Sequence, residues 1–255
     1  MSKIVKYILH DIFRNRILIA YILLLCLSSV GLFLMNDDKA KGISSLLTIM
    51  MIVIPLVSIL FTTIYFFNSY EFIEMLVAQP LRRSKILLGV YAGVGCSLLT
   101  AFLVGIGIPV MIFDGTLTGW YLIMAGGMLT FVFVSLAFLS SVITRDKTRG
   151  VGIAILIWFF YALIFDGILL MVLFALSDYP LEKTTIIISC LNPVDLARIM
   201  VLLKMDISAL MGYTGAVFNQ YFGSGLGILI SIAVLALWII APLLLALRIF
   251  NKKNL

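Results

Sequence analysis

The amino-acid sequence predicts an all-α membrane protein with six transmembrane helices in one domain, residues 1–255. Hydrophobic residues make up 63% of the chain, charged residues make up 12%, and the mean hydropathy is +1.21. A soluble globular domain has about 25% charged residues and is about half apolar. Six apolar runs are each long enough to cross the roughly 30 Å of hydrocarbon in a bilayer, so they set the number of spans.

The expected spans cover residues 17–35, 43–67, 86–113, 120–143, 151–176 and 226–249. Of the 18 Lys and Arg residues, 13 fall on one side of these spans and 5 on the other. By the positive-inside rule both termini are cytoplasmic, in a multi-pass protein of the bacterial inner membrane. The first apolar run lacks a small-residue cleavage site and is expected to be retained. The net charge of +6 then reflects topology and attraction to anionic lipids, not to nucleic acid.

Residues 2–16 predict an amphipathic helix at the inner interface. Ile4, Ile8 and Ile12 fall on one face, whereas Asp11 and Arg14 point elsewhere. Such a helix can serve as an anchor or contact a cytoplasmic partner, and both roles stay open. His10 is the one histidine of the chain, and alone it supports neither a metal site nor a proton relay.

The inner loop 68–85, NSYEFIEMLVAQPLRRSK, predicts a short helix that ends before a basic cluster. A loop needed only for reversal can be much shorter, as residues 114–119 are on the other side, so the extra length suggests a docking surface. The alternative is that the basic residues only hold the topology. The candidate docking residues are Glu71, Phe72, Glu74, Met75, Pro80, Arg82 and Arg83.

The outer segment 177–225 predicts one or two short helices that lie on the outer leaflet or dip into it. Asn192 and Pro193 begin a helix with Asp195 in its first turn. Arg198 and Lys204 argue against a seventh span. The apolar stripe of this helix must be covered by lipid, by the bundle or by another protein.

Asp166 lies inside the fifth span, where an ionised carboxylate is costly. We expect it to face the bundle interior, a cavity or a partner subunit, and both a packing role and a functional role stay open. Glycines in the third and fourth spans, such as Gly89, Gly93 and Gly126, favour close helix approach. The scattered methionines and three distant cysteines are typical of core packing, so no metal or other cofactor is expected to bind this chain directly.

Motifs for catalysis are absent from the sequence. It contains no GxxxxGK[ST] phosphate loop, no HExxH and no GxSxG. The polar residues predicted inside the bundle do not form a nucleophile with its base. The chain is therefore not expected to be an enzyme.

The N-terminal helix, the six spans and the loop YEFIEMLVAQPLRRSKILLG resemble the permease subunit of the ABC-2 class of ABC transporters. Within that class the outer stretch LNPVDLARIMVLLKMDISALMGYTGAVF is similar to the NosY type, from NosDFY complexes that help to mature the copper sites of nitrous oxide reductase. The resemblance implies a homodimer with two cytoplasmic NosF-like ATPase subunits, which bind ATP and Mg and engage the inner loops.

The resemblance also implies a periplasmic, copper-handling NosD-like protein on the outer face. Its expected contacts are Asn192, Pro193, Asp195, Arg198, Met200, Met205 and Tyr213. The hypothesis is that ATP hydrolysis in the partner moves the inner helix and that rigid spans carry the displacement outward. Two alternatives stay open: a general ABC-2 exporter of a lipid, drug or other hydrophobic substrate, and a membrane anchor or assembly subunit without energy coupling. The transported species is not predicted.

Overall fold

The computed structural model describes residues 2–36, 38–79, 81–144, 146–175, 182–205 and 212–252. Within these ranges the regular elements are all helices. They are α1 (Ser2–Phe13), α2 (Arg16–Met35), α3 (Lys39–Asn68), α4 (Tyr70–Val77), α5 (Arg83–Phe102), η1 (Leu103–Gly107), α6 (Ile108–Phe113), α7 (Leu117–Ile143), α8 (Lys147–Phe159), η2 (Phe160–Ile164), α9 (Phe165–Ala175), α10 (Glu182–Cys190), α11 (Pro193–Leu202) and α12 (Gly212–Lys252).

In the described part of the chain, six helical stretches are long and apolar enough to cross a bilayer, which confirms the predicted fold class. α2, α3 and α7 each form one span. The third span joins α5, η1 and α6, the fifth covers 147–172, and the sixth is the 225–252 part of α12. The predicted bounds agree to within about four residues.

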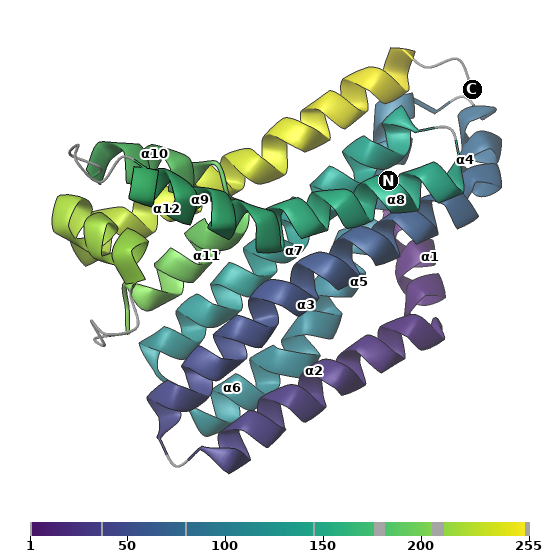
Figure 1. Cartoon of the computed structure of the whole chain (residues 1–255). Coiled ribbons are helices and arrows are strands. Elements are labelled where there is room, and N and C mark those ends of the chain that lie inside the picture. The colour runs from purple at the N-terminus through teal and green to yellow at the C-terminus, as the bar shows by residue number, and fades with distance from the viewer. Residues whose placement is uncertain are drawn as a thin grey trace.

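The two ends of the bundle carry different elements (Figure 1). α1, α4 and the last turns of α12 lie at one end, which we call the basic end. α10 and α11 lie at the other, which we call the hairpin end. At the basic end, the side chains of Ser84 and Asn251 hydrogen-bond to each other and join the start of α5 to the end of α12.

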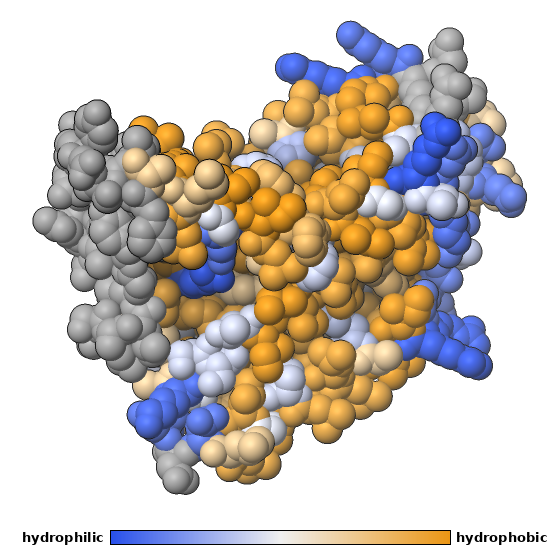
Figure 2. Space-filling view, in the orientation of Figure 1, coloured by the Kyte–Doolittle hydropathy of each residue, from blue (hydrophilic) through white to orange (hydrophobic). Residues whose placement is uncertain are grey.

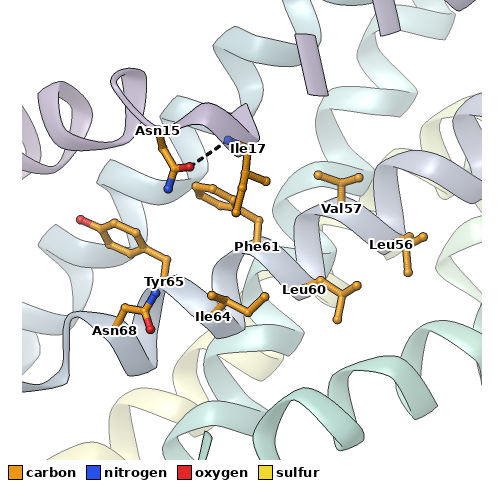
Figure 3. A pocket seen from close by; sticks show the side chains of 9 residues that line it. All are labelled: Asn15, Ile17, Leu56, Val57, Leu60, Phe61, Ile64, Tyr65 and Asn68. Atoms are coloured by element: carbon orange, nitrogen blue, oxygen red, sulfur yellow. Dashed lines mark hydrogen bonds between the residues drawn. The ribbon is translucent and has the colours of Figure 1, made fainter. Parts of the chain in front are cut away.

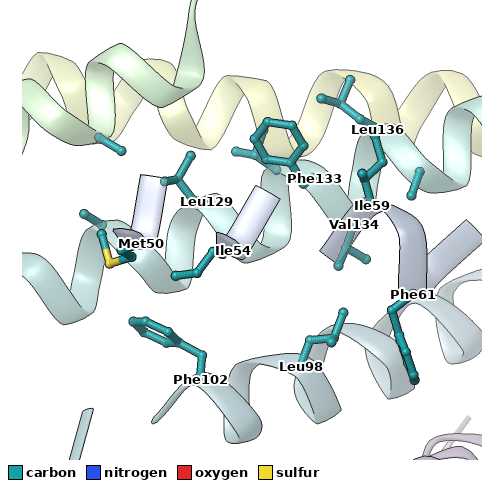
Figure 4. Packing of buried hydrophobic residues seen from close by; sticks show 14 of the residues in the cluster. Met50, Ile54, Ile59, Phe61, Leu98, Phe102, Leu129, Phe133, Val134 and Leu136 are labelled. Atoms are coloured by element: carbon teal, nitrogen blue, oxygen red, sulfur yellow. The ribbon is translucent and has the colours of Figure 1, made fainter. Parts of the chain in front are cut away.

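α7 is the central helix of the bundle. Of its most apolar stretch, 72% is buried, against 17% for the span that begins with α8. Figure 4 shows α3, α5 and α7 meeting through Met50, Phe102 and Leu129. A Cβ atom at Gly126 would overlap the ring of Phe102, so this glycine permits the close approach predicted for it.

Two spans contain a π-helical turn, η1 in the third and η2 in the fifth. A side chain from another helix bonds to a carbonyl in each. Ser29 Oγ donates to the carbonyl of Gly105 at 2.8 Å, and Asn192 Nδ2 donates to that of Tyr161 at 3.2 Å. π-Turns inside helices often occur at functional positions. These two fix α2 and α11 against the neighbouring spans.

Candidate functional site

The short helix predicted in the loop at the basic end is present as α4, and its docking role stays a prediction. Ile73 is its buried residue, whereas Glu71, Glu74 and Met75 are exposed, the last at 62%. Arg82, also exposed, lies where α5 begins, and Arg83 is half-buried. Pro80 lies outside the described residues. α4 therefore presents acidic groups and an apolar side chain to the surroundings.

The amphipathic N-terminal helix is confirmed as α1, and it packs on α5 through a seat made by two glycines. A Cβ atom at Gly93 would lie 2.6 Å from Ile8 Cγ2, and one at Gly89 would lie 3.1 Å from Ile4 Cγ2. Ile8 is 1% exposed. Small residues one turn apart let α1 approach the α5 backbone closely, so α1 is held against the bundle.

Side chains of α1 also reach α4 and α3. The rings of Tyr7 and Phe72 stack with their centroids 5.3 Å apart. Tyr65 Oη donates a hydrogen bond to Asp11 Oδ2 at 3.2 Å. These contacts join α1, α3, α4 and α5 into one unit. The sequence analysis singled out Phe72 but missed Tyr7 and Asp11, and the GxxxG spacing of Gly89 and Gly93 was the available signal for the seat.

At the hairpin end, the apolar stripe of α11 is covered by the bundle, one of the three alternatives that the sequence left open. It packs against α7 and α12 and is buried along its length, because apolar side chains occupy nearly every face. The bond from Asn192 to Tyr161 places its first residues about 21 Å along the fifth span, counted as fourteen residues from Lys147. Asn192 also caps the helix, accepting from the Val194 amide at 3.0 Å.

This burial changes the interpretation of the expected outer contacts. The structure buries Asn192, Pro193, Asp195, Met200 and Met205 inside the chain, so in this conformation their side chains do not form a surface for a partner. Arg198 is half-exposed. Tyr213 lies in α12, and its side chain is outside the described residues. The outer partner itself stays a prediction.

Asp166, Asp195 and Arg198 form a charged cluster between α9 and α11. Arg198 Nη1 lies 3.3 Å from Asp166 Oδ2 and 3.4 Å from Asp195 Oδ1. Asp166 thus lies against Arg198 of α11, although its side chain is 37% exposed, and its functional role stays a prediction. Figure 2 shows hydrophilic atoms recessed in a hollow of the apolar surface near these helices.

The cluster has two carboxylates for one guanidinium. Asp195 is 2% exposed, and its Oδ2 has no hydrogen-bond partner among the described residues. Burial raises the pKa of the Asp195 carboxyl to about 6; Asp166 raises it further, and Arg198 acts in the opposite direction. Within the described ranges, no three His, Cys, Asp or Glu side chains lie together as metal ligands.

Known proteins resemble the chain along nearly its whole length. A family model described as ABC-2 family transporter protein matches residues 24–255. The probable ABC transporter permease protein NosY of Stutzerimonas stutzeri is 28% identical over 96% of this chain and 95% of its own. Its namesake in Pseudomonas aeruginosa is 29% identical with the same coverage. The chain therefore belongs to the ABC-2 family of transporter proteins, as a multi-pass membrane permease subunit.

Proposed function

We propose that this permease works as a homodimer with two cytoplasmic ATPase subunits, which bind ATP and Mg and dock at the basic end. The proposal rests on which side chains of α4 are held by the protein and which are exposed. Ile73 and the Tyr7–Phe72 stack hold this helix against the protein, while Glu71, Glu74 and Met75 stay available to a partner. Exposed acidic groups beside an exposed apolar side chain suit docking to a partner protein whose contact surface has a basic rim.

The packing also supports a route by which displacement of α4 would reach the hairpin end. α4 contacts α1 and α5, α5 packs on the central helix α7, and α7 packs on α11. Such contacts are tight, because glycines bring backbones together at the α1–α5 and α5–α7 contacts. In the proposal, ATP-driven motion of α4 therefore repositions α11 and its charged cluster.

The docking proposal is tested by replacing Glu74 and Arg82 together with alanine in the permease reconstituted with its ATPase. We expect weaker ATPase binding and loss of the coupling between ATP hydrolysis and the complex's output. The matched control is the double alanine variant of Asp146 and Arg149, which removes an exposed acid and an exposed base at the start of α8, at the same end. Normal coupling in the Glu74/Arg82 variant would contradict the proposal.

The similarity to the NosY proteins supports a narrower role in the maturation of the copper sites of nitrous oxide reductase. In this role the hairpin end delivers work to a periplasmic, NosD-like protein that handles copper. Deletion of the gene in a host that respires nitrous oxide should then yield copper-deficient reductase, and the permease should co-purify with the periplasmic protein. A permease and ATPase that alone transport a hydrophobic substrate, with normal reductase in the deletion strain, would favour a general exporter.

A further inference from the structure

A cavity of about 280 Å³ lies between the α1–α2 junction and α3, at the basic end of the bundle. Its lining residues are Asn15, Ile17, Leu56, Val57, Leu60, Phe61, Ile64, Tyr65 and Asn68. None of the exposed α4 residues of the docking proposal lines it. Figure 3 shows that the polar side chains Asn15, Tyr65 and Asn68 gather at one end, whereas the aliphatic side chains run along α3 away from them. The cavity therefore has the polarity of an amphiphile.

The length of the cavity matches one leaflet of a bilayer. Its lining runs along α3 from Leu56 to Asn68, twelve residues that rise about 18 Å. Half of the hydrocarbon core is about 15 Å thick. The polar end lies close to the end of the span, where lipid headgroups would be. An acyl chain from the leaflet at the basic end thus fits the aliphatic track.

The charges around the polar end favour an anionic headgroup. Lys147 Nζ donates to Asn68 Oδ1 at 2.7 Å, which places an ammonium group at the rim. Arg14 and Arg16, both exposed, flank Asn15 in the chain. The opposing carboxylate is that of Asp11, which accepts from Tyr65. Asp146, which precedes Lys147, is paired with Arg149 at 3.4 Å, so these two charges offset each other. The remaining three cations and one acid leave an excess of positive charge, and basic pockets between spans on the cytoplasmic side of a membrane are typical of phospholipid binding.

We propose that this cavity binds an anionic phospholipid of the leaflet at the basic end. The phosphate lies near Lys147 and the arginines beside Asn15, and one acyl chain lies along Leu56, Val57, Leu60 and Phe61 of α3. The lipid fills the space between the α1–α2 junction and α3. The proposal depends on the membrane orientation of the bundle but not on the identity of the ATPase or of an outer partner.

Native mass spectrometry of the purified permease tests the proposal, with phosphatidylglycerol and phosphatidylcholine of identical acyl chains added in competition. The wild type should retain phosphatidylglycerol preferentially. Lys147→Gln should reduce that preference by about fivefold, the effect of one cation near a phosphate. Leu60→Trp, which blocks the aliphatic track, should reduce retention of both lipids. The matched control is Leu237→Trp, at a side chain 62% exposed on α12, which should behave as the wild type.

Three results would overturn the proposal. Equal retention of the two lipids by the wild type would remove the anionic specificity, and unchanged retention in Leu60→Trp would place the lipid elsewhere. Efficient crosslinking between two copies through Leu60→Cys in native membranes, with the native cysteines replaced, would assign the groove to a second permease instead. Lys147 is exposed, so its substitution keeps the test informative if the tryptophan variant fails to fold.

Discussion

Substitution of Gly93 by alanine should weaken the packing of α1 on α5. The new Cβ atom would lie 2.6 Å from Ile8 Cγ2 and 2.8 Å from Ile8 Cβ. Favourable carbon contacts lie at about 3.5–4.0 Å, so one of the helices must retreat by about 1 Å. A new rotamer of Ile8 cannot relieve the overlap, because its Cβ is fixed to the α1 backbone. Overpacking of this kind costs about 1–3 kcal/mol.

Two other glycine-to-alanine variants provide a graded comparison. At Gly89 the nearest atom to the new Cβ would be Ile4 Cγ2 at 3.1 Å, and at Gly152 nothing lies within 4 Å. All three substitutions gain up to about 1 kcal/mol of helix propensity. We therefore expect Gly152→Ala to be neutral or stabilising, Gly89→Ala to have a small effect, and Gly93→Ala to destabilise the seat.

Hydrogen exchange of the α1 peptide measures the seat directly. A loss of 1–3 kcal/mol in local opening free energy corresponds to roughly 5- to 150-fold faster exchange. Exchange of α7 should not change, since α7 is the central helix. Equal α1 exchange in all three variants would refute the argument that the glycine seat holds α1.

Three further predictions concern the hairpin end and the π-turns. The folded state holds the Asp195 proton more tightly than the unfolded chain does, because burial raises the pKa of this carboxyl from 3.8 to about 6. The free energy of unfolding should therefore fall by up to about 3 kcal/mol as the pH rises through this range. Asp195→Asn should thus raise the thermal unfolding temperature at pH 7.5 but not at pH 4, and an equal change at both would contradict the assignment. Asn192→Ala and Asn192→Ser both lose the hydrogen bond to Tyr161, but serine can still cap α11. Asn192→Ala should therefore lower stability by about 1 kcal/mol more than Asn192→Ser in thermal unfolding. Equal losses would count against the cap. Ser29→Ala removes the hydrogen bond to Gly105 of the third span and should cost about 1 kcal/mol in the same assay. Ser28→Ala should cost less, because the Ser28 hydroxyl bonds to Leu25 within α2.

The spans and their order could be predicted from the sequence because lipid imposes a single requirement on each of them. A spanning helix must be long and apolar and satisfy its own backbone, so hydropathy alone places the spans within a few residues. The helix α4 was also predictable, since the alternation of Glu71 and Glu74 with apolar residues is local. These features need no knowledge of tertiary contacts.

The stripe residues alone did not decide what covers α11, because an apolar stripe fits lipid, the bundle and a partner equally well. Val194, Ala197 and Val201 widen that stripe over the remaining faces, and this was the available signal for burial. The pairing of Asp166 with Arg198 depends on where η2 directs the chain, and local composition does not encode a π-turn. The Gly93–Ile8 contact likewise joins residues 85 positions apart.

The central claim is that nucleotide hydrolysis at the basic end moves the hairpin end. Spin labels at Leu117→Cys in α7 and Ile187→Cys in α10, both exposed in the structure, report the distance between these helices by pulsed electron paramagnetic resonance. In the reconstituted complex we predict that the distance distribution changes between the nucleotide-free and ATP-trapped states, and that the Glu74/Arg82 double alanine variant abolishes the change. Identical distributions in both states of the intact complex would contradict the account.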